Sequence, residues 1–243
     1  MNNYKLLISY DGTEYYGWQN QPNMKTIQGE IESALRKIFN NQKISLIGSG
    51  RTDSGVHALN QAANFHIKTN MSDVQIKNAL NANLDNSIFV NSCVAVSDEF
   101  HARFSALKRE YVYKATTDYS PFSKNYEWKI KYKLNLERLN YCSQLLIGEH
   151  DFSKFCKSTS RKENNNCNIF ESKWNIKNEK IAYTIVSDRF LHHMVRLLVG
   201  TMVEVGVGRI SVSEFKCLVD NDSCSLNPVK APASGLFLKN VFY

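Results

Sequence analysis

A glycine-rich stretch near the start of the chain carries the residues best suited to chemistry. Residues 48–58 read GSGRTDSGVHA, so Asp53 lies between glycines and two residues after Arg51. Glycine lets the backbone turn sharply and lets a bulky ligand approach, and a nearby guanidinium favours an ionised carboxylate. The stretch therefore predicts a loop that presents one aspartate to a ligand at close range.

Other interpretations of this loop compete with that one. Glycine-rich loops often do no more than turn the chain. A phosphate-binding loop is disfavoured because the stretch lacks a Gly-Lys-Ser/Thr ending, and a metal site because His57 has no second ligand at suitable spacing nearby. The residues alone support an activated aspartate in a tight loop only as a hypothesis.

A second charged residue of interest is Arg196. It lies in a predicted helix, residues 190–205, whose side chains are apolar on almost every face. A helix that is apolar nearly all round is buried, so Arg196 needs a partner. Either its stripe faces a polar site, or it forms a structural ion pair with Glu204 or Asp188. The adjacent His192 and His193 would point to different faces without a third ligand, which disfavours zinc.

Two tyrosines, Tyr111 and Tyr113, share one face of an expected strand over 109–117. Strand tyrosines usually pack in the core. A tyrosine in a site can instead stack on a nucleic-acid base with its hydroxyl free to form a hydrogen bond. We assign Tyr113 to the core and keep both alternatives for Tyr111.

Further motifs follow in a fixed order. They read YDGT at 10–13, GWQ at 17–19, FHARFSA at 100–106, REYVYK at 109–114, FLHHMVR at 190–196 and APASGL at 231–236. Together with the Asp53 stretch, they resemble the TruA family of tRNA pseudouridine synthases, from about residue 4 to the C-terminus. Several separated motifs in the right order are far more specific than any one of them.

The resemblance implies isomerisation of uridine to pseudouridine at positions 38, 39 and 40 of the tRNA anticodon arm, with Asp53 as the catalytic nucleophile and without cofactor or metal. It implies that Arg196 faces Asp53 and that Tyr111 contacts the target base. The expected substrate-binding residues are Tyr111, Arg51, Arg196 and Leu236, and the expected RNA-binding residues are Arg103, Phe100, His101 and Phe104. The family acts as a homodimer on tRNA.

We consider two alternative functions. A synthase of the same superfamily could act on other RNA uridines, because the surfaces that read RNA shape choose the target. A catalytically silent RNA-binding module is the other, although pure binding needs no carboxylate facing RNA phosphate. The segment 156–168, rich in Ser, Lys and Asn, predicts a mobile loop and departs from the family pattern.

Composition agrees with a soluble domain that handles RNA. The chain has 243 residues, a formal charge of +7 and a pI near 9.0, which suits a polyanionic partner. The six cysteines show no Cys-x-x-Cys pair and predict reduced thiols in a cytoplasmic protein. We expect no signal peptide and no membrane span, because no apolar run approaches the roughly 18 residues that a span needs.

The pattern of elements is α+β, in two similar halves, residues 1–106 and 107–243. The first half predicts strands over 5–10, 43–47, 61–67 and 88–96, with helices that begin at Thr26 and at a Ser72/Gln75 capping box. The second predicts strands over 109–117, 126–132, 169–176, 181–187 and 236–243. It also predicts a helix from Leu136 that Gly148 ends, the helix 190–205, and one capped by Ser211 and Glu214. The resemblance implies one continuous antiparallel sheet flanked by helices, with the active cleft between the halves.

Overall fold

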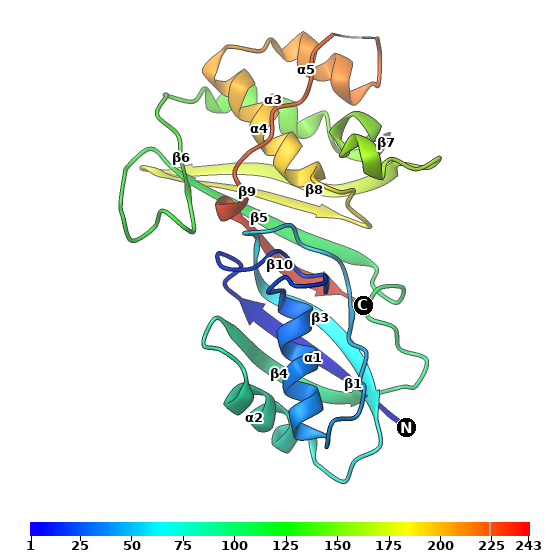
Figure 1. Cartoon of the computed structure of the whole chain (residues 1–243). Coiled ribbons are helices and arrows are strands. Elements are labelled where there is room, and N and C mark those ends of the chain that lie inside the picture. Colours follow the sequence, from blue (N-terminus) through cyan, green and yellow to red (C-terminus); the bar gives the residue numbers. More distant parts are fainter. Residues whose placement is uncertain (224) are drawn as a thin grey trace. The chain divides into compact units, whose positions relative to one another are not determined.

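The computed structural model describes residues 1–223 and 225–243 (Figure 1), so the expected thiol of Cys224 lies outside the described residues. The chain forms two compact units, residues 1–107 with 237–243, and residues 108–236. The last seven residues, which the sequence places in the second half, therefore belong to the first unit. Each unit is an α+β structure, as the sequence predicts.

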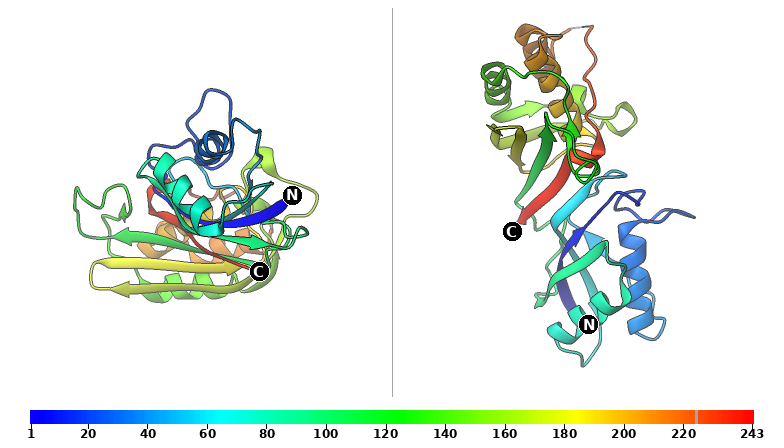
Figure 2. Two further views of the ribbon diagram at one scale, coloured as in Figure 1. Left: turned by 90° about the horizontal axis from the view of Figure 1, so that it is seen from below. Right: turned by 90° about the vertical axis from the view of Figure 1, so that its left-hand side faces the viewer.

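The first unit is built on a sheet in the order β4-β1-β3-β10. Its strands are β1 (Asn2–Tyr10), β2 (Ile47–Gly48), β3 (His57–Ile67), β4 (Ile88–Val96) and β10 (Leu236–Phe242), and its helices are α1 (Ile27–Ile38) and α2 (Asp73–Asn83). Both helices lie over the same face of the sheet (Figure 2), and each has buried apolar side chains. Buried apolar surface of this kind supplies most of the stability of such a layer.

The predicted helix starts of the first unit are confirmed. The Thr26 side chain accepts a hydrogen bond from the Gly29 N–H at the start of α1. Ser72 and Gln75 form both hydrogen bonds of a capping box at the start of α2. Each cap satisfies backbone N–H groups that have no partner inside the helix, which fixes where the helix begins.

The second unit is built on a sheet in the order β5-β9-β8-β7. Its strands are β5 (Lys108–Thr116), β6 (Trp128–Lys129), β7 (Gly148–Asp151), β8 (Asn166–Lys177) and β9 (Lys180–Ser187), and its helices are α3 (Leu136–Gln144), α4 (Met194–Val207) and α5 (Val212–Val219). The three helices gather on one face of this sheet (Figure 1). The expected hairpin of β8 and β9 and the capping box of Ser211 and Glu214 are both confirmed.

Several element boundaries differ from those predicted, and β3 and β8 begin four and three residues earlier than expected. The strands expected over 43–47 and 126–132 shrink to β2 and β6, and α3 ends at Gln144 rather than just before Gly148. Helix α4 begins at Met194, not near residue 190, because His193 adopts a left-handed backbone conformation with φ 68°. Two pairings are parallel, β10 with β3 and β6 with β5, so the sheets are mixed.

Among the described residues, no helix has the length and apolar character to cross a membrane. Cysteines contribute to the apolar interior of both units. Cys93, Cys142, Cys156 and Cys167 are buried free thiols. Burial raises the pKa of Cys93, Cys142 and Cys167 to about 12, against 9.0 for an exposed thiol.

These pKa values predict slow alkylation of the folded protein and weaker stability at high pH. The unfolded chain releases thiol protons near pH 9 that the folded chain holds to about pH 12, so the stabilisation is complete below pH 9 and decreases above it. Iodoacetamide at pH 8 should label these cysteines slowly in buffer and rapidly in urea. Equal rates in both conditions would contradict the burial of the thiols.

Candidate active site

Asp53 lies in a tight turn of the first unit. The Val56 N–H donates to the Asp53 carbonyl oxygen at 3.1 Å, and Gly55 has a φ of +76°, a conformation that favours glycine. The Gly55 N–H and the Ser54 hydroxyl both donate to the Tyr15 carbonyl oxygen, at 3.3 and 3.1 Å. The Tyr15 carbonyl oxygen thus fixes the backbone of the turn, while Asp53 remains partly exposed.

The start of the loop is fixed to strand β3 by one buried side chain. The Ser49 hydroxyl donates to Oε1 of Gln61 at 2.7 Å, and Nε2 of Gln61 donates to the Gly50 carbonyl oxygen at 2.9 Å. Ser49 and Gln61 are both buried. Because both ends of the carboxamide are used, Gln61 sets the path of the chain as it enters the Asp53 turn.

The motifs at 10–13 and 17–19 form hydrogen bonds with Thr52, at the start of this turn. The Tyr10 hydroxyl shares a 2.8 Å hydrogen bond with Oγ1 of Thr52, and the Trp18 N–H donates to the Thr52 carbonyl oxygen at 3.1 Å. Gly17 has a φ of +87°, and a Cβ there would lie 2.6 Å from the Thr52 oxygen. Thr52, the residue before the candidate nucleophile, is therefore held through its side chain and its backbone.

A buried histidine connects the same two segments. His57 packs its ring on Phe237 with centroids 4.6 Å apart, and its Nδ1 accepts a hydrogen bond from the Gly12 N–H at 3.1 Å. A Cβ at Gly12 would lie 2.0 Å from the Val56 carbonyl oxygen, so only glycine fits there. His57 therefore has a structural role at the end of the loop, and the sequence did not reveal this use.

The Tyr10 hydroxyl offers a first test of this support. Tyr10→Phe removes the hydroxyl that meets Thr52 in a buried place, and we expect a loss of about 1 kcal/mol in the free energy of unfolding. We also expect a lower kcat with little change in KM, because the loop and not the RNA surface is disturbed. Urea unfolding and steady-state kinetics measure the two effects, and a change confined to KM would contradict this role.

The segment 100–104 presents two side chains from a fixed backbone. The Ala102 N–H donates to Oδ1 of Asn64 at 2.9 Å, and Nδ1 of His101 accepts from the N–H groups of Arg103 and Phe104 at 3.2 and 3.3 Å. The Phe104 ring is 76% exposed and the Arg103 guanidinium lies 5.5 Å from its centroid. An exposed arginine and an exposed aromatic ring suit contact with RNA, whereas His101 serves mainly to hold the turn.

The ring of Phe100 belongs to a different cluster. It packs on Tyr243 with centroids 4.9 Å apart, and the Lys5 ammonium lies over both rings. The Tyr243 hydroxyl donates to the Ala102 carbonyl oxygen at 2.9 Å. Of the four expected RNA-binding residues, Arg103 and Phe104 are thus exposed, and Phe100 and His101 are half-buried.

In the second unit, both tyrosines of β5 are largely buried. Tyr111 is 9% exposed and meets Phe190 edge-on with centroids 5.0 Å apart. Tyr113 is buried, as expected, and its hydroxyl donates to the Pro232 carbonyl oxygen at 2.9 Å. Tyr111 therefore lies beside the turn that leads into α4, with only a small part of its ring exposed.

Arg196 extends from α4 to the segment 229–236. Its Nε donates to the Ala231 carbonyl oxygen at 2.9 Å, and the Ala231 N–H donates back to the Arg196 carbonyl oxygen at 3.0 Å. One turn along the helix, a Cβ at Gly200 would lie 2.2 Å from the Val229 carbonyl oxygen. The helix and the segment are therefore in backbone contact, which places the guanidinium beside the last motif of the chain.

The carboxylates proposed as structural partners of Arg196 are used elsewhere. Glu204 pairs with Arg209 at 3.2 Å. Oδ1 of Asp188 accepts from the N–H groups of Asn168 and Arg189 at 2.9 and 2.7 Å. The role of Arg196 as a site residue stays a prediction.

His192 and His193 lie before the helix and not on it. Their ring centroids are 4.2 Å apart, and Nδ1 of His192 shares a 2.9 Å hydrogen bond with the Ser160 hydroxyl. The argument that the two rings occupy opposite helix faces is therefore wrong, since α4 begins only at Met194. The backbone turn at His193 brings both rings to one place.

The structure therefore gathers the expected site residues into two groups. Asp53 and Arg51 share the loop of the first unit, where Arg51 is exposed. Tyr111, Arg196 and Leu236 belong to the second unit, where Leu236 is buried after Gly235, whose Cβ would lie 2.5 Å from the Lys114 carbonyl oxygen. The pairing of Arg196 with Asp53 stays a prediction.

Comparisons with known proteins assign the chain to a family. A family model described as tRNA pseudouridine synthase matches residues 6–105 and 142–243. Proteins named tRNA pseudouridine synthase A from Thermosipho melanesiensis, Bacillus sp. (strain KSM-64) and Caldicellulosiruptor saccharolyticus are 40%, 39% and 38% identical, and each alignment covers 100% of both chains. The chain thus belongs to the TruA family of tRNA pseudouridine synthases, the isomerases that convert uridines of tRNA to pseudouridine.

Proposed function

We propose that this enzyme isomerises uridines 38, 39 and 40 in the anticodon arm of tRNA, with Asp53 as the nucleophile. The observation that carries the proposal is the support of Asp53. Residues on both sides of it are held by backbone and side-chain hydrogen bonds, while its carboxylate is partly exposed. A nucleophile held in one place loses little freedom when it reacts, which lowers the barrier.

The isomerisation of uridine to pseudouridine requires one carboxylate and residues that hold the base. The bond between N1 and C1′ breaks, the uracil turns, and a bond between C5 and C1′ forms, while C5 loses a hydrogen and N1 gains one. Atoms and electrons balance within the nucleotide. Covalent attack by Asp53 divides this change into easier steps, and both attack at C1′ and attack at C6 are consistent with one carboxylate.

The target base must leave its stem before it can react. Extrusion of a nucleotide from a helix costs a few kcal/mol, which contacts to the flipped nucleotide must offset. Arg51 is exposed next to Asp53 and suits a phosphate or the vacated place in the stem. Tyr111 and Arg196 supply the aromatic edge and the guanidinium expected from the family.

We further propose that the enzyme acts as a homodimer in the cytoplasm. Light scattering of the purified protein would measure its oligomeric state.

The test is single-turnover reaction of unmodified tRNA transcripts that carry uridine at only one of positions 38, 39 and 40. Pseudouridine is mapped by carbodiimide labelling and primer extension, with no metal or nucleotide added. A matched transcript with cytidine at all three positions is the control. Product at other uridines of the control transcript would contradict the assignment of positions. Tight binding without product from any transcript would contradict the function.

A further inference from the structure

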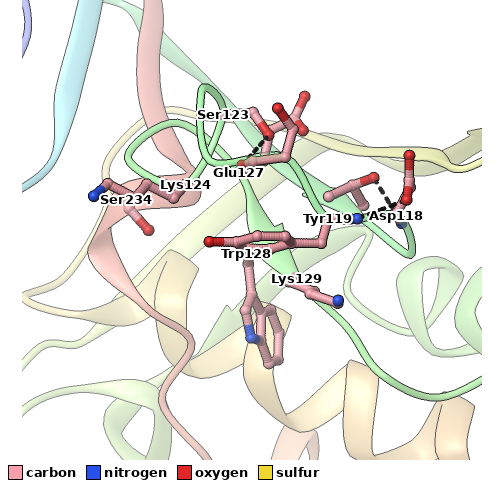
Figure 3. Close-up of a pocket in the computed structure, with 10 residues that line it drawn as sticks. Asp118, Tyr119, Ser123, Lys124, Glu127, Trp128, Lys129 and Ser234 are labelled. Carbon is pink, nitrogen blue, oxygen red and sulfur yellow. Dashed lines mark hydrogen bonds between the residues drawn. The ribbon is translucent and has the colours of Figure 1, made fainter.

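The connection between β5 and β6 surrounds a hollow that the isomerisation chemistry does not use. The hollow is about 220 Å³ in volume, and residues of the second unit line it (Figure 3). Its lining residues are Thr116, Asp118, Tyr119, Ser120, Ser123, Lys124, Glu127, Trp128, Lys129 and Ser234. Tyr119 and Trp128 form its aromatic part, and Lys124 lies at the end away from Asp118.

The stretch 119–132, which supplies most of the residues that line this hollow, also carries exposed aromatic side chains. Phe122 is 90% exposed, Tyr119 58%, Tyr132 49% and Tyr126 39%. Such rings cost free energy when they face water, and a cluster of them marks a binding surface. Four exposed rings within fourteen residues are more than is expected where exposed aromatic residues are scattered singly over a surface.

Lysines alternate with these rings along the same stretch. They are Lys124, Lys129, Lys131 and Lys133, and all four are exposed. The Lys129 ammonium lies 4.9 Å from the centroid of Tyr119. The acidic residue Glu127 already pairs with Lys180 at 2.7 Å, so its charge is compensated within the protein. The stretch therefore presents net positive charge beside exposed rings.

The loop holds this arrangement through its own hydrogen bonds. The N–H groups of Tyr126 and Glu127 donate to the Ser123 carbonyl oxygen at 2.9 and 3.0 Å, and the Thr117 N–H donates to the Glu179 carbonyl oxygen at 3.0 Å. Trp128 meets Tyr113 edge-on with centroids 6.2 Å apart. The rings and ammonium groups are thus presented from a fixed backbone, which lowers the entropy cost of binding.

We propose that this hollow and its exposed rings form a second RNA contact, which binds an unpaired nucleotide of the tRNA outside the target uridine. Bases stack on aromatic rings in a sequence-tolerant way, and lysines neutralise the backbone phosphates beside them. A base stacks on Phe122 or Tyr119, and Lys124 meets a phosphate. The inference rests on tRNA as the substrate and deepens the proposed function.

The test compares two variants with matched controls. Phe122→Ala and Lys124→Ala alter the proposed contact, and Phe89→Ala and Lys37→Ala change exposed residues of the same types in the first unit. Filter binding of full-length tRNA is measured from low to high salt, with thermal unfolding of each variant. We expect Phe122→Ala to raise Kd about 5- to 150-fold and Lys124→Ala to reduce the salt slope by about 1.

The kinetics separate this contact from the catalytic proposal. KM should increase in both variants, while kcat at saturating tRNA stays within about twofold of wild type, because neither residue touches the reacting uridine. Kd values and salt slopes equal to those of the controls would overturn the contact. A changed oligomeric state without a change in tRNA affinity would overturn it too, in favour of a protein partner. Failure of the Asp53 proposal would appear in kcat of Asp53→Asn instead.

Discussion

Asp53→Asn is expected to lower the single-turnover rate by on the order of 10⁴-fold, as loss of an essential catalytic side chain does in other enzymes. The substitution keeps the size and shape of the side chain, and the hydrogen bonds at Thr52, Gly55 and Val56 do not involve the carboxylate. What is lost is the negative charge of the proposed nucleophile. Rapid-quench assays with excess enzyme measure this rate directly.

The same variant should bind tRNA within a few fold of wild type. Phosphate contacts dominate affinity, and the single carboxylate of Asp53 contributes little to them. Asp53→Ala is a companion variant that removes the side chain altogether and should be equally inactive. Near-normal turnover in either variant would overturn the assignment of Asp53, whereas weak binding together with inactivity would point to a damaged fold.

Gly12→Ala is expected to produce the second large effect. Its Cβ would lie 2.0 Å from the Val56 carbonyl oxygen and 3.2 Å from the Val56 nitrogen, so the backbone must separate there. Overpacking of this kind costs about 1–3 kcal/mol, and a shift of about 1 Å at a catalytic group can lower the rate about 100-fold. We therefore expect a lower Tm and a much lower kcat.

Gly50→Ala is the matched control for stability. Gly50 lies in the Asp53 loop, which Gly12 contacts at Val56, and a Cβ at Gly50 meets nothing within 4 Å. Its Tm should stay close to wild type, because alanine fits the open space without contact with a neighbour. A similar fall in Tm for both variants would show that the loss does not depend on the close approach of Gly12 to Val56, and would contradict the specific role of that contact.

Regular elements could be predicted well where a local signal was strong. Thr26 and Ser72 mark helix starts because capping hydrogen bonds depend on a few neighbouring residues. Strand β4 follows the predicted residues 88–96. Long-range features were harder, since β10 joins the first unit through pairing of Phe237 with His57, residues far apart in the sequence. No local pattern contains that information.

The candidate site shows the same division. Asp53, Arg51 and Arg196 stood out because charge among glycines or apolar residues is unusual. The supporting roles of Tyr10, Gly12 and Gln61 did not, because each depends on contacts with partners distant in the sequence. His193 misled the prediction of α4, because a left-handed backbone in a histidine has no sequence signal of its own. Distant contacts of this kind appear only in the folded structure.

Strand β10 has a consequence for how the protein is made. The first unit comprises residues 1–107 and 237–243, so the ribosome completes the second unit before it supplies the last strand of the first. Until then β3 lacks its parallel partner and His57 lacks the ring of Phe237. A chain that stops before residue 237 would contain the complete Asp53 loop without the strand that supports its end. In newly synthesised protein, the Asp53 loop thus gains the support of β10 only after the whole second unit has been synthesised.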